Sequence, residues 1–311
     1  MAEKEKTIRE CINGYTLCTD WRTSGTAQWA YAEKDGKQWF IKRFLAPKYK
    51  IAGEGISEKM VEKARKRCEA FREKQIEYYT HIENADTGNI VYVTDFFSFE
   101  THFYAVSPRI AIADVSAEEI SNLSHDKKMI LLKVLTHSLK NLHEQSVVHA
   151  DLKPSNIIIK KTVSGNYTLK LIDFDAGFLE ADPRRGENIV FDPVYVAPET
   201  IIAMGDTTIT LNRKIDIFAL GLLFHQYYSG RLPELPEGYL HAADAVLDEK
   251  RMKVSATVPT WLAELIMQML HPEPEKRPET AVVFQWLQEQ KKPMEQQPVQ
   301  QSFFRRPMLK R

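Results

Sequence analysis

The sequence predicts an α+β protein made of two unequal parts. Residues 12–107 combine short β-type runs with one long helical pattern, whereas residues 108–291 repeat apolar residues at helical spacing. We therefore expect a small, sheet-rich lobe with one long helix, followed by a larger and mainly helical lobe. Residues 292–311 are rich in Gln and Pro and then basic, which is typical of a flexible tail.

The composition narrows the class of function. The chain has 311 residues, 43% hydrophobic and 27% charged, enough apolar material for two lobes. Lys plus Arg and Asp plus Glu number 42 each, so the charge balance gives no argument for a nucleic-acid or membrane partner, and no nucleic-acid partner is expected. The longest apolar run, 217–224, is too short to span a bilayer. Without a signal peptide, and with three cysteines that lack metal-ligand spacing, the chain is expected to be cytoplasmic with reduced thiols.

Three patterns build the first part. The runs "QWAYAE" and "KQWFIKRF" flank "KDG", which predicts two strands joined by a turn. Residues 57–82 carry apolar side chains near one helical face, and their many charges are typical of a solvated face. The stretch "NIVYVTDFFSFETHFYAVS" predicts two more strands.

Helical patterns dominate the second part. A helix is expected to begin at the N-cap Ser124, with leucines along one face. A second is expected at 211–229 and ends at Gly230. Two more are expected at 259–270 and 279–290.

The stretch "VVHADLKPSNIIIK", 147–160, places polar residues before an apolar strand. With "YTLKLIDF" it predicts a hairpin that turns at residues 164–165 and sets Asn156 opposite Asp173. An amide oxygen and a carboxylate at paired strand ends can bind a hard cation such as Mg²⁺. Asp151, five residues before Asn156, lies where it can accept a proton from an attacking hydroxyl.

Three segments resemble the protein-kinase superfamily. "HADLKPSN" resembles the catalytic loop H-R-D-L-K-x-x-N, "DFDAGF" resembles the D-F-G segment, and "WFIKRF" resembles V-A-I-K. The resemblance implies that Asp151 is the catalytic base and that Lys153 contacts the transferred phosphate. It also implies that Asn156 and Asp173 bind Mg²⁺, and that Lys42 binds the α- and β-phosphates of ATP.

Further segments follow in the order that the family has them, and the likeness covers about residues 12–290. "APE" ends at Glu199, "DIFALG" begins at Asp216, and "HPEPEKRPE" contains Arg277. The resemblance implies that Asp216 anchors the catalytic loop and that Arg277 pairs with Glu199. The chain looks most like bacterial kinases that resemble eukaryotic Ser/Thr kinases, so a bilobal protein-kinase-like fold is expected.

The nucleotide side departs from the family pattern. The phosphate-covering loop, "DWRTSGTA", has Gly25 as its only glycine, although glycine lets such a loop approach phosphates closely. Phe40 takes the place of a small residue over the adenine. By resemblance, Ile158 floors the adenine pocket and Val106 marks the hinge between the lobes.

A helix glutamate is expected to pair with Lys42. Its context, "FREKQI", favours Glu73. Glu69 and Glu77 are spaced four residues away on either side, near the same helix face, and they remain alternatives.

The segment 173–199 contains no Ser or Thr, and its only hydroxyl belongs to Tyr195. The usual arginine that receives an activating phosphate is replaced by Ala150. We therefore expect activity without phosphorylation of this segment, which would be ordered by its own charges at positions 180, 182, 184 and 185. Asp175 replaces the glycine of D-F-G, and Asp192 replaces a threonine typical of Ser/Thr kinases.

The expected function is an ATP- and Mg²⁺-dependent protein kinase that phosphorylates Ser or Thr of a protein substrate. One alternative is a pseudokinase scaffold, which the poor glycine loop favours. Another is a kinase that acts on a small molecule. The extended helix 57–82 and the tail 292–311 are candidate docking surfaces for a partner.

Overall fold

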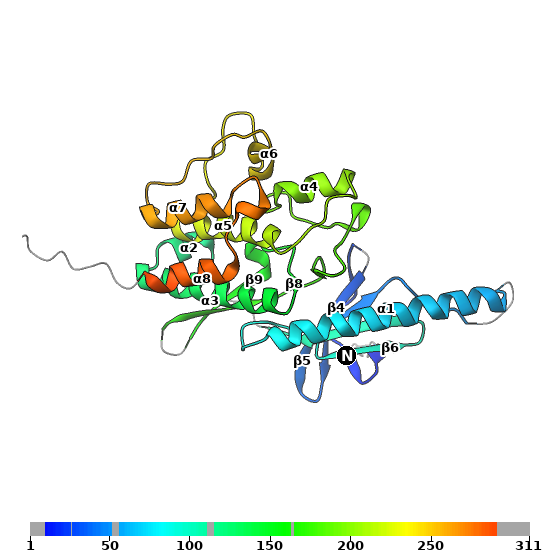
Figure 1. Ribbon diagram of the computed structural model, residues 1–311. Helices are drawn as coiled ribbons and strands as arrows, with labels where there is room; N and C mark the ends of the chain where they lie inside the picture. The colour runs from blue at the N-terminus through cyan, green and yellow to red at the C-terminus, as the bar shows by residue number, and fades with distance from the viewer. Residues whose placement is uncertain (1–9, 26, 52–55, 111–114, 163–164, 291–311) are drawn as a thin grey trace, which may run out of the picture.

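The computed structural model describes residues 10–25, 27–51, 56–110, 115–162 and 165–290. Its elements form two lobes, a curled antiparallel sheet with one long helix and a larger helical lobe (Figure 1). This is the α+β, bilobal arrangement that the sequence predicts. The predicted tail, 292–311, lies outside the described residues.

The sheet of the first lobe has the order β1-β2-β4-β5-β7-β6, with β3 paired to β4. The predicted turn joins β4 to β5 through Asp35 and Gly36, whose φ values are 53° and 69°. Such paired positive φ angles match the twist of a tight hairpin. The strands are β1 (Cys11–Ile12), β2 (Tyr15–Leu17), β3 (Arg22–Ser24), β4 (Ala27–Lys34), β5 (Lys37–Phe44), β6 (Asp95–Phe99) and β7 (His102–Pro108).

The two faces of this sheet have different roles because side chains alternate along each strand. One face buries an apolar cluster that includes Ile41 and Val106, which are paired across β5 and β7. Lys42 and Phe40 lie on the opposite face. There the Phe40 ring stacks on Trp29, with ring centroids 5.4 Å apart.

Helix α1 (Glu58–Ala85) confirms the predicted long helix and ends three residues later than expected. Its first half projects beyond the sheet (Figure 1), and its buried residues begin only at Cys68. Phe71 then packs on Phe44 of β5, with ring centroids 5.2 Å apart. The second half of α1 is therefore the part that contacts the sheet and the other lobe.

The second lobe is built around α5 (Lys214–Ser229), in which 13 of the 16 residues are buried. The helix ends as predicted at Gly230, whose φ of 81° makes it a left-handed cap. The predicted helices α3 (His125–Glu144), α7 (Thr260–Met269) and α8 (Thr280–Glu289) are present. Three short helices were not predicted: α2 (Ala117–Ser121), α4 (Pro198–Gly205) and α6 (Ala242–Leu247).

The second lobe also contains two small two-stranded sheets. Strand β8 (Val147–Val148) pairs with β11 (Phe178–Leu179), and β9 (Ile157–Lys161) pairs with β10 (Tyr167–Leu171). The second pair forms the predicted hairpin.

The predicted register of that hairpin is wrong by one residue. Ile157 pairs with Leu171, and the backbone nitrogen of Ile172 donates to the carbonyl oxygen of Asn156 at 3.0 Å. The backbone nitrogen of Thr162 donates to the Asn166 carbonyl oxygen at 2.7 Å, which closes a three-residue loop where a two-residue turn was expected. Asn156 therefore lies opposite Ile172, and Asp173 follows one residue later.

All three cysteines are unpaired thiols. Among the described helices, none has both the length and the apolar character needed to cross a membrane.

Candidate active site

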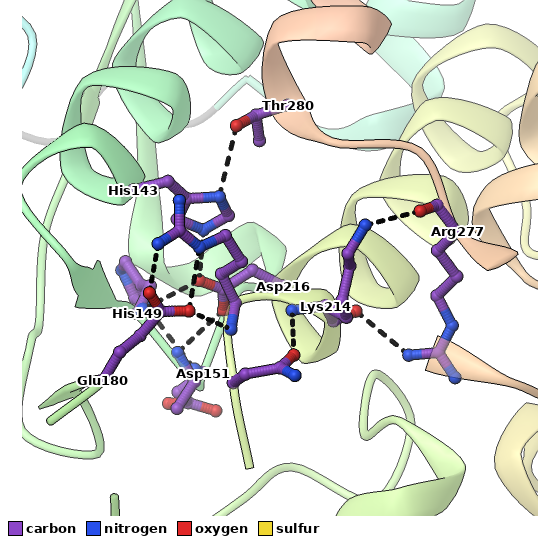
Figure 2. A network of polar contacts seen from close by, with 11 residues as sticks. His143, His149, Asp151, Glu180, Lys214, Asp216, Arg277 and Thr280 are labelled. Atoms are coloured by element: carbon purple, nitrogen blue, oxygen red, sulfur yellow. Dashed lines mark hydrogen bonds and ion pairs between the residues drawn. The ribbon is translucent and has the colours of Figure 1, made fainter. Parts of the chain in front are cut away.

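The loop after β8 is anchored to helix α5 by one buried carboxylate. Asp216 of α5 is 1% exposed, and it accepts hydrogen bonds from the backbone nitrogens of His149 and Ala150, each at 2.8 Å. It also contacts the His143 ring nitrogen Nε2 at 3.0 Å, and Thr280 lies 3.2 Å from the other nitrogen of that ring (Figure 2). The predicted anchoring of the loop by Asp216 is confirmed.

Ala150 shows what this anchoring does to the backbone. Its φ of 62° lies in the left-handed region, which is unfavourable for a residue other than glycine. The hydrogen bond to Asp216 holds Ala150 in this conformation. The strained turn places Asp151 immediately after the anchored residues.

A second buried pair holds the first turn of α4 against the rest of the helical lobe. The Arg277 guanidinium is 1% exposed and makes two hydrogen bonds to the Glu199 carboxylate, at 2.6 and 2.8 Å. Lys214 donates to the Arg277 carbonyl oxygen at 2.6 Å (Figure 2). The predicted pair of Arg277 and Glu199 is confirmed, and its bidentate geometry fixes both partners.

The Asp151 carboxylate has two unequal oxygens. Oδ2 accepts hydrogen bonds from the Asn156 amide nitrogen and the Lys153 ammonium, each at 2.8 Å. Oδ1 is buried and has no hydrogen-bond partner among the described residues. A buried acceptor without a partner is costly, so this oxygen favours the binding of a donor.

Lys153 lies between two carboxylates. Its ammonium is 2.8 Å from Asp151 and 3.6 Å from Asp192. Burial lowers the pKa of Lys153, but the hydrogen bond to Asp151 and the charges of Asp151 and Asp192 outweigh it and raise that pKa. Lys153 therefore stays charged at neutral pH. Asp192 thus contacts Lys153 from the position where the protein-kinase pattern usually has a threonine.

Asp173 follows β10 and has a φ of 61°. The second carboxylate close to it is that of Asp175. Partial desolvation raises the pKa of Asp173, and the charge of Asp175 raises it further. A nearby cation would relieve this repulsion.

The available oxygens fit Mg²⁺. The described part of the chain holds no cluster of three or more His, Cys, Asp or Glu that could bind a metal by itself. Mg²⁺ needs only one or two protein oxygens when phosphates complete its shell. Asn156 uses its amide nitrogen for both of its side-chain hydrogen bonds to Asp151, so neither of these bonds occupies its amide oxygen.

Lys42 has a different partner from the one expected. Its ammonium forms an ion pair with Asp175. Glu69 pairs instead with Arg65 at 2.9 Å. Glu73 and Glu77 are exposed and make no ion pair within the described residues. The expected pair of Lys42 and Glu73 is not seen.

The residues assigned to the nucleotide lie in different environments. Gly25 is at the β3–β4 turn with a φ of 53° and open space around it. Ile158 is buried, yet it belongs to neither apolar core cluster. Val106 differs from expectation: its side chain is in the sheet core opposite Lys42, and its carbonyl oxygen accepts from the Thr94 nitrogen at 2.8 Å. The residues that follow β7 include 111–114, which lie outside the described part.

All four charges expected to order the segment 173–199 have partners. Glu180 pairs with Arg213, Asp182 pairs with Lys74 of α1, and Arg185 donates to the Thr207 carbonyl oxygen at 2.9 Å. Arg184 donates to backbone carbonyl oxygens within the segment, those of residues 175 and 177.

Sequence reasoning missed the contact that joins α1 to this segment. The buried Tyr78 hydroxyl donates to the Phe174 carbonyl oxygen at 2.9 Å. Burial raises the pKa of Tyr78 well above its ordinary value, so the hydroxyl remains a donor. A Cβ at Gly177 would lie 2.0 Å from this hydroxyl and 2.7 Å from the Val148 carbonyl oxygen. Only glycine fits at position 177. In the sequence, the glycine of "DAG" was the only sign of this close contact.

Comparison with known protein families identifies a domain in this chain. The sequence pattern of the protein kinase domain matches residues 48–289, well over half of the chain. The match begins after β5 and so leaves out Gly25 and Lys42.

Curated relatives carry kinase names. The ovarian-specific serine/threonine-protein kinase Lok of Drosophila melanogaster is 33% identical over 181 residues, which are 55% of this chain and 37% of the fly protein. Serine/threonine-protein kinase pkn2 of Myxococcus xanthus is 30% identical over 161 residues, 49% of this chain and 19% of the bacterial protein. Serine/threonine-protein kinase PSK2 of Saccharomyces cerevisiae is 27% identical over 222 residues, 68% of this chain and 19% of the yeast protein. The chain thus matches well under half the length of each relative.

Proposed function

This chain belongs to the protein kinase family, and we propose that it transfers the γ-phosphate of ATP to Ser or Thr of a protein substrate. The serine/threonine-protein kinase names of its relatives support this acceptor class. In this proposal Asp151 accepts the proton of the attacking hydroxyl, and Lys153 contacts the phosphate that moves. Lys42 binds the α- and β-phosphates. Gly25 and Ile158 contact the nucleotide.

Asn156 and Asp173 would hold Mg²⁺. When bound, the ion neutralises the charge that develops on the phosphate oxygens. The residues of this chain provide positioning and fixed charge, which are the main needs of phosphoryl transfer.

The observation that carries the proposal is the state of the Asp151 carboxylate. Its Oδ2 is fixed by Asn156 and Lys153 at 2.8 Å each, whereas its buried Oδ1 has no partner within the described residues. A substrate hydroxyl that donates to Oδ1 would satisfy this oxygen and give up its proton to it. A turn with only a structural role would gain nothing from an unsatisfied oxygen there.

We also propose that activity does not need phosphorylation of the segment 173–199. The contacts of Glu180, Asp182, Arg184 and Arg185 support this, since each tethers the segment without a phosphate. The one hydroxyl in the segment, that of Tyr195, donates to Gln226 at 2.7 Å and is partly buried.

A scaffold without catalysis is the second candidate. The single glycine of the loop at Gly25 and the absence of a pair between Lys42 and a helix glutamate favour it. The fixed geometry of Asp151 disfavours it, because a scaffold has no use for a positioned base.

The test is transfer of labelled γ-phosphate from ATP, with Mg²⁺, to the chain and to a generic protein acceptor. Asp151→Asn and Asp173→Asn should each lower the rate about a hundredfold or more. Tyr195→Phe should stay within about twofold of the parent, because it removes one neutral hydrogen bond. Asp126→Asn, in the first turn of α3, serves as the matched control.

Label on Ser or Thr that disappears in both aspartate variants supports the proposal. Binding of ATP without transfer to any protein acceptor would overturn it in favour of the scaffold. Transfer to a small molecule alone would overturn the protein-acceptor class. A strong loss of transfer in Tyr195→Phe would overturn independence from phosphorylation.

A further inference from the structure

The open question at this site is what positions Lys42. A phosphate-binding lysine must be held in place, because its flexible side chain otherwise samples many conformations. The Lys42 side chain is 13% exposed and lies 4.8 Å from the Phe44 ring centroid, and the Phe44 ring in turn packs on Phe71 of α1. The two candidate sources of a carboxylate partner are α1 and the segment 173–177.

Helix α1 does not present a glutamate toward the site. Phe71 contacts Phe44 on the lysine strand, and Tyr78 contacts Phe174 of the neighbouring segment. Residues four apart share a helix face, so the residue between these two contacts is Gln75, which is partly buried. Glu73 is exposed, as expected for a residue two positions away from Gln75.

Lys74, the neighbour of Gln75 on α1, is positively charged, which is the opposite of the charge that Lys42 requires. Lys74 pairs with Asp182 of the segment 173–199. The side of α1 that faces this segment therefore offers an amide and an ammonium. Neither of these groups can supply the negative charge that Lys42 needs.

Asp175 supplies this charge from the other side. Its carboxylate forms the ion pair with Lys42, and its backbone carbonyl oxygen accepts a hydrogen bond from Arg184. Its backbone nitrogen donates to the Asp173 carboxylate at 3.4 Å. Asp175 thus connects the lysine of the sheet directly to the carboxylate that we assign to the metal.

We propose that Asp175 is the positioning residue for Lys42 and that it takes the role that the family gives to a helix glutamate, while Gln75 occupies the helix position. This inference rests on the proposed function, because positioning matters only if Lys42 binds nucleotide phosphates. It makes the lysine follow the segment 173–177 and not the orientation of α1. It also gives a use to an aspartate at a position where the family pattern has glycine.

The first test is a zero-length crosslink, which does not depend on activity. A carbodiimide couples an ammonium directly to a carboxylate that contacts it, and peptide mass spectrometry identifies the amide. The expected product in the nucleotide-free chain joins Lys42 to Asp175. Coupling of Lys140 to Glu144, an ion pair within α3, is the internal control for the reagent.

The second test moves the carboxylate. Asp175→Gly should lower kcat/KM for ATP about tenfold or more, mainly through KM because Lys42 then binds the phosphates less well. Adding Gln75→Glu to Asp175→Gly should restore the value to within about threefold of the parent. Glu144→Gln is the matched control, since it removes the carboxylate of a lysine pair within α3 that has no role in the proposed site, and it should leave the rate unchanged.

The outcomes separate this inference from the proposed function. A crosslink from Lys42 to Glu73, Glu69 or Glu77, or none from Lys42 while the control pair couples, would overturn the inference. So would a Glu73→Gln variant that loses activity while Asp175→Gly keeps it, or a failure of Gln75→Glu to rescue. A parent chain that transfers no phosphate would overturn the proposed function, and the crosslink would still decide the role of Asp175.

Discussion

The loop that carries Asp151 and the strand that carries Lys42 are held in opposite ways. Around the loop, a carboxylate that is 1% exposed, Asp216, binds two backbone nitrogens and a buried ring. Around Lys42, the partner is Asp175, whose side chain is 59% exposed. The first arrangement fixes backbone atoms, and the second fixes the end of one flexible side chain.

This difference indicates which part of the site is formed before a ligand binds. Buried donors pointed at one carboxylate cannot be left without it, since each unsatisfied group costs about 1–3 kcal/mol. An ion pair with a largely exposed partner contributes little stability and is screened by solvent. The loop that carries Asp151 should therefore be rigid in the free protein, whereas the position of Lys42 should respond to nucleotide.

The largest expected effect comes from removing the anchor of the loop. Asp216→Ala leaves the backbone nitrogens of His149 and Ala150 and the His143 ring without their acceptor. We expect the free energy of unfolding to fall by about 3–5 kcal/mol, measured by denaturant unfolding.

The control is Asp126→Ala, an aspartate in the first turn of α3. Its loss should change the stability by less than about 1 kcal/mol. Equal effects of the two substitutions would contradict the contrast between the two regions.

An intermediate effect is expected at the contact between α1 and the segment 173–177. Tyr78→Phe removes the hydrogen bond to the Phe174 carbonyl oxygen, and the free energy of unfolding should fall by about 1–2 kcal/mol. The neighbouring Tyr79→Phe is the control, because that hydroxyl has no hydrogen-bond partner among the described residues. A loss as large as that of Asp216→Ala would show that the α1 side is as firmly anchored as the loop.

The smallest expected effect is that of Glu180, and it depends on pH. Burial raises the pKa of Glu180, but the hydrogen bonds and charge of Arg213 outweigh it and lower that pKa below its ordinary value. The stabilisation is therefore present above the ordinary pKa of glutamate, about 4.3, and is lost as the pH falls through the lowered value.

Glu180→Gln should cost about 1 kcal/mol at pH 7, after screening by solvent is considered. The difference between parent and variant should shrink below about pH 4.3, as followed by denaturant midpoints. A gap that widens on acidification would contradict the ion pair as its source.

The sequence was informative where a pattern is long or a turn is tightly restricted. Helix α1, with 28 residues, and helix α5, which ends at Gly230, were both predicted. The short helices α2, α4 and α6 have five to eight residues, too few to repeat an apolar spacing. The register of the β9–β10 hairpin was missed because a three-residue loop and a two-residue turn leave similar sequence signals.

The roles of individual residues at the site could not be predicted, because they depend on which face of each helix or strand is turned toward the site. The spacing of Glu69, Glu73 and Glu77 showed that they share one side of α1, but the packing of Phe71 and Tyr78 turns that side outward. Val106 was misplaced for a similar reason. Its pairing with Ile41 sets it on the core face of the sheet, and a sequence does not show which residue lies opposite another.

The most direct test of the contrast is native-state hydrogen exchange with and without ATP and Mg²⁺. In the free protein, the amides of His149 and Ala150 should exchange only through global unfolding, and nucleotide should leave their protection unchanged apart from overall stabilisation. The amide of Asp175 should gain protection of about tenfold or more beyond that when nucleotide is added. Rapid exchange at Ala150 in the free protein, slowed only by nucleotide, would contradict a loop around Asp151 that is formed before nucleotide binds.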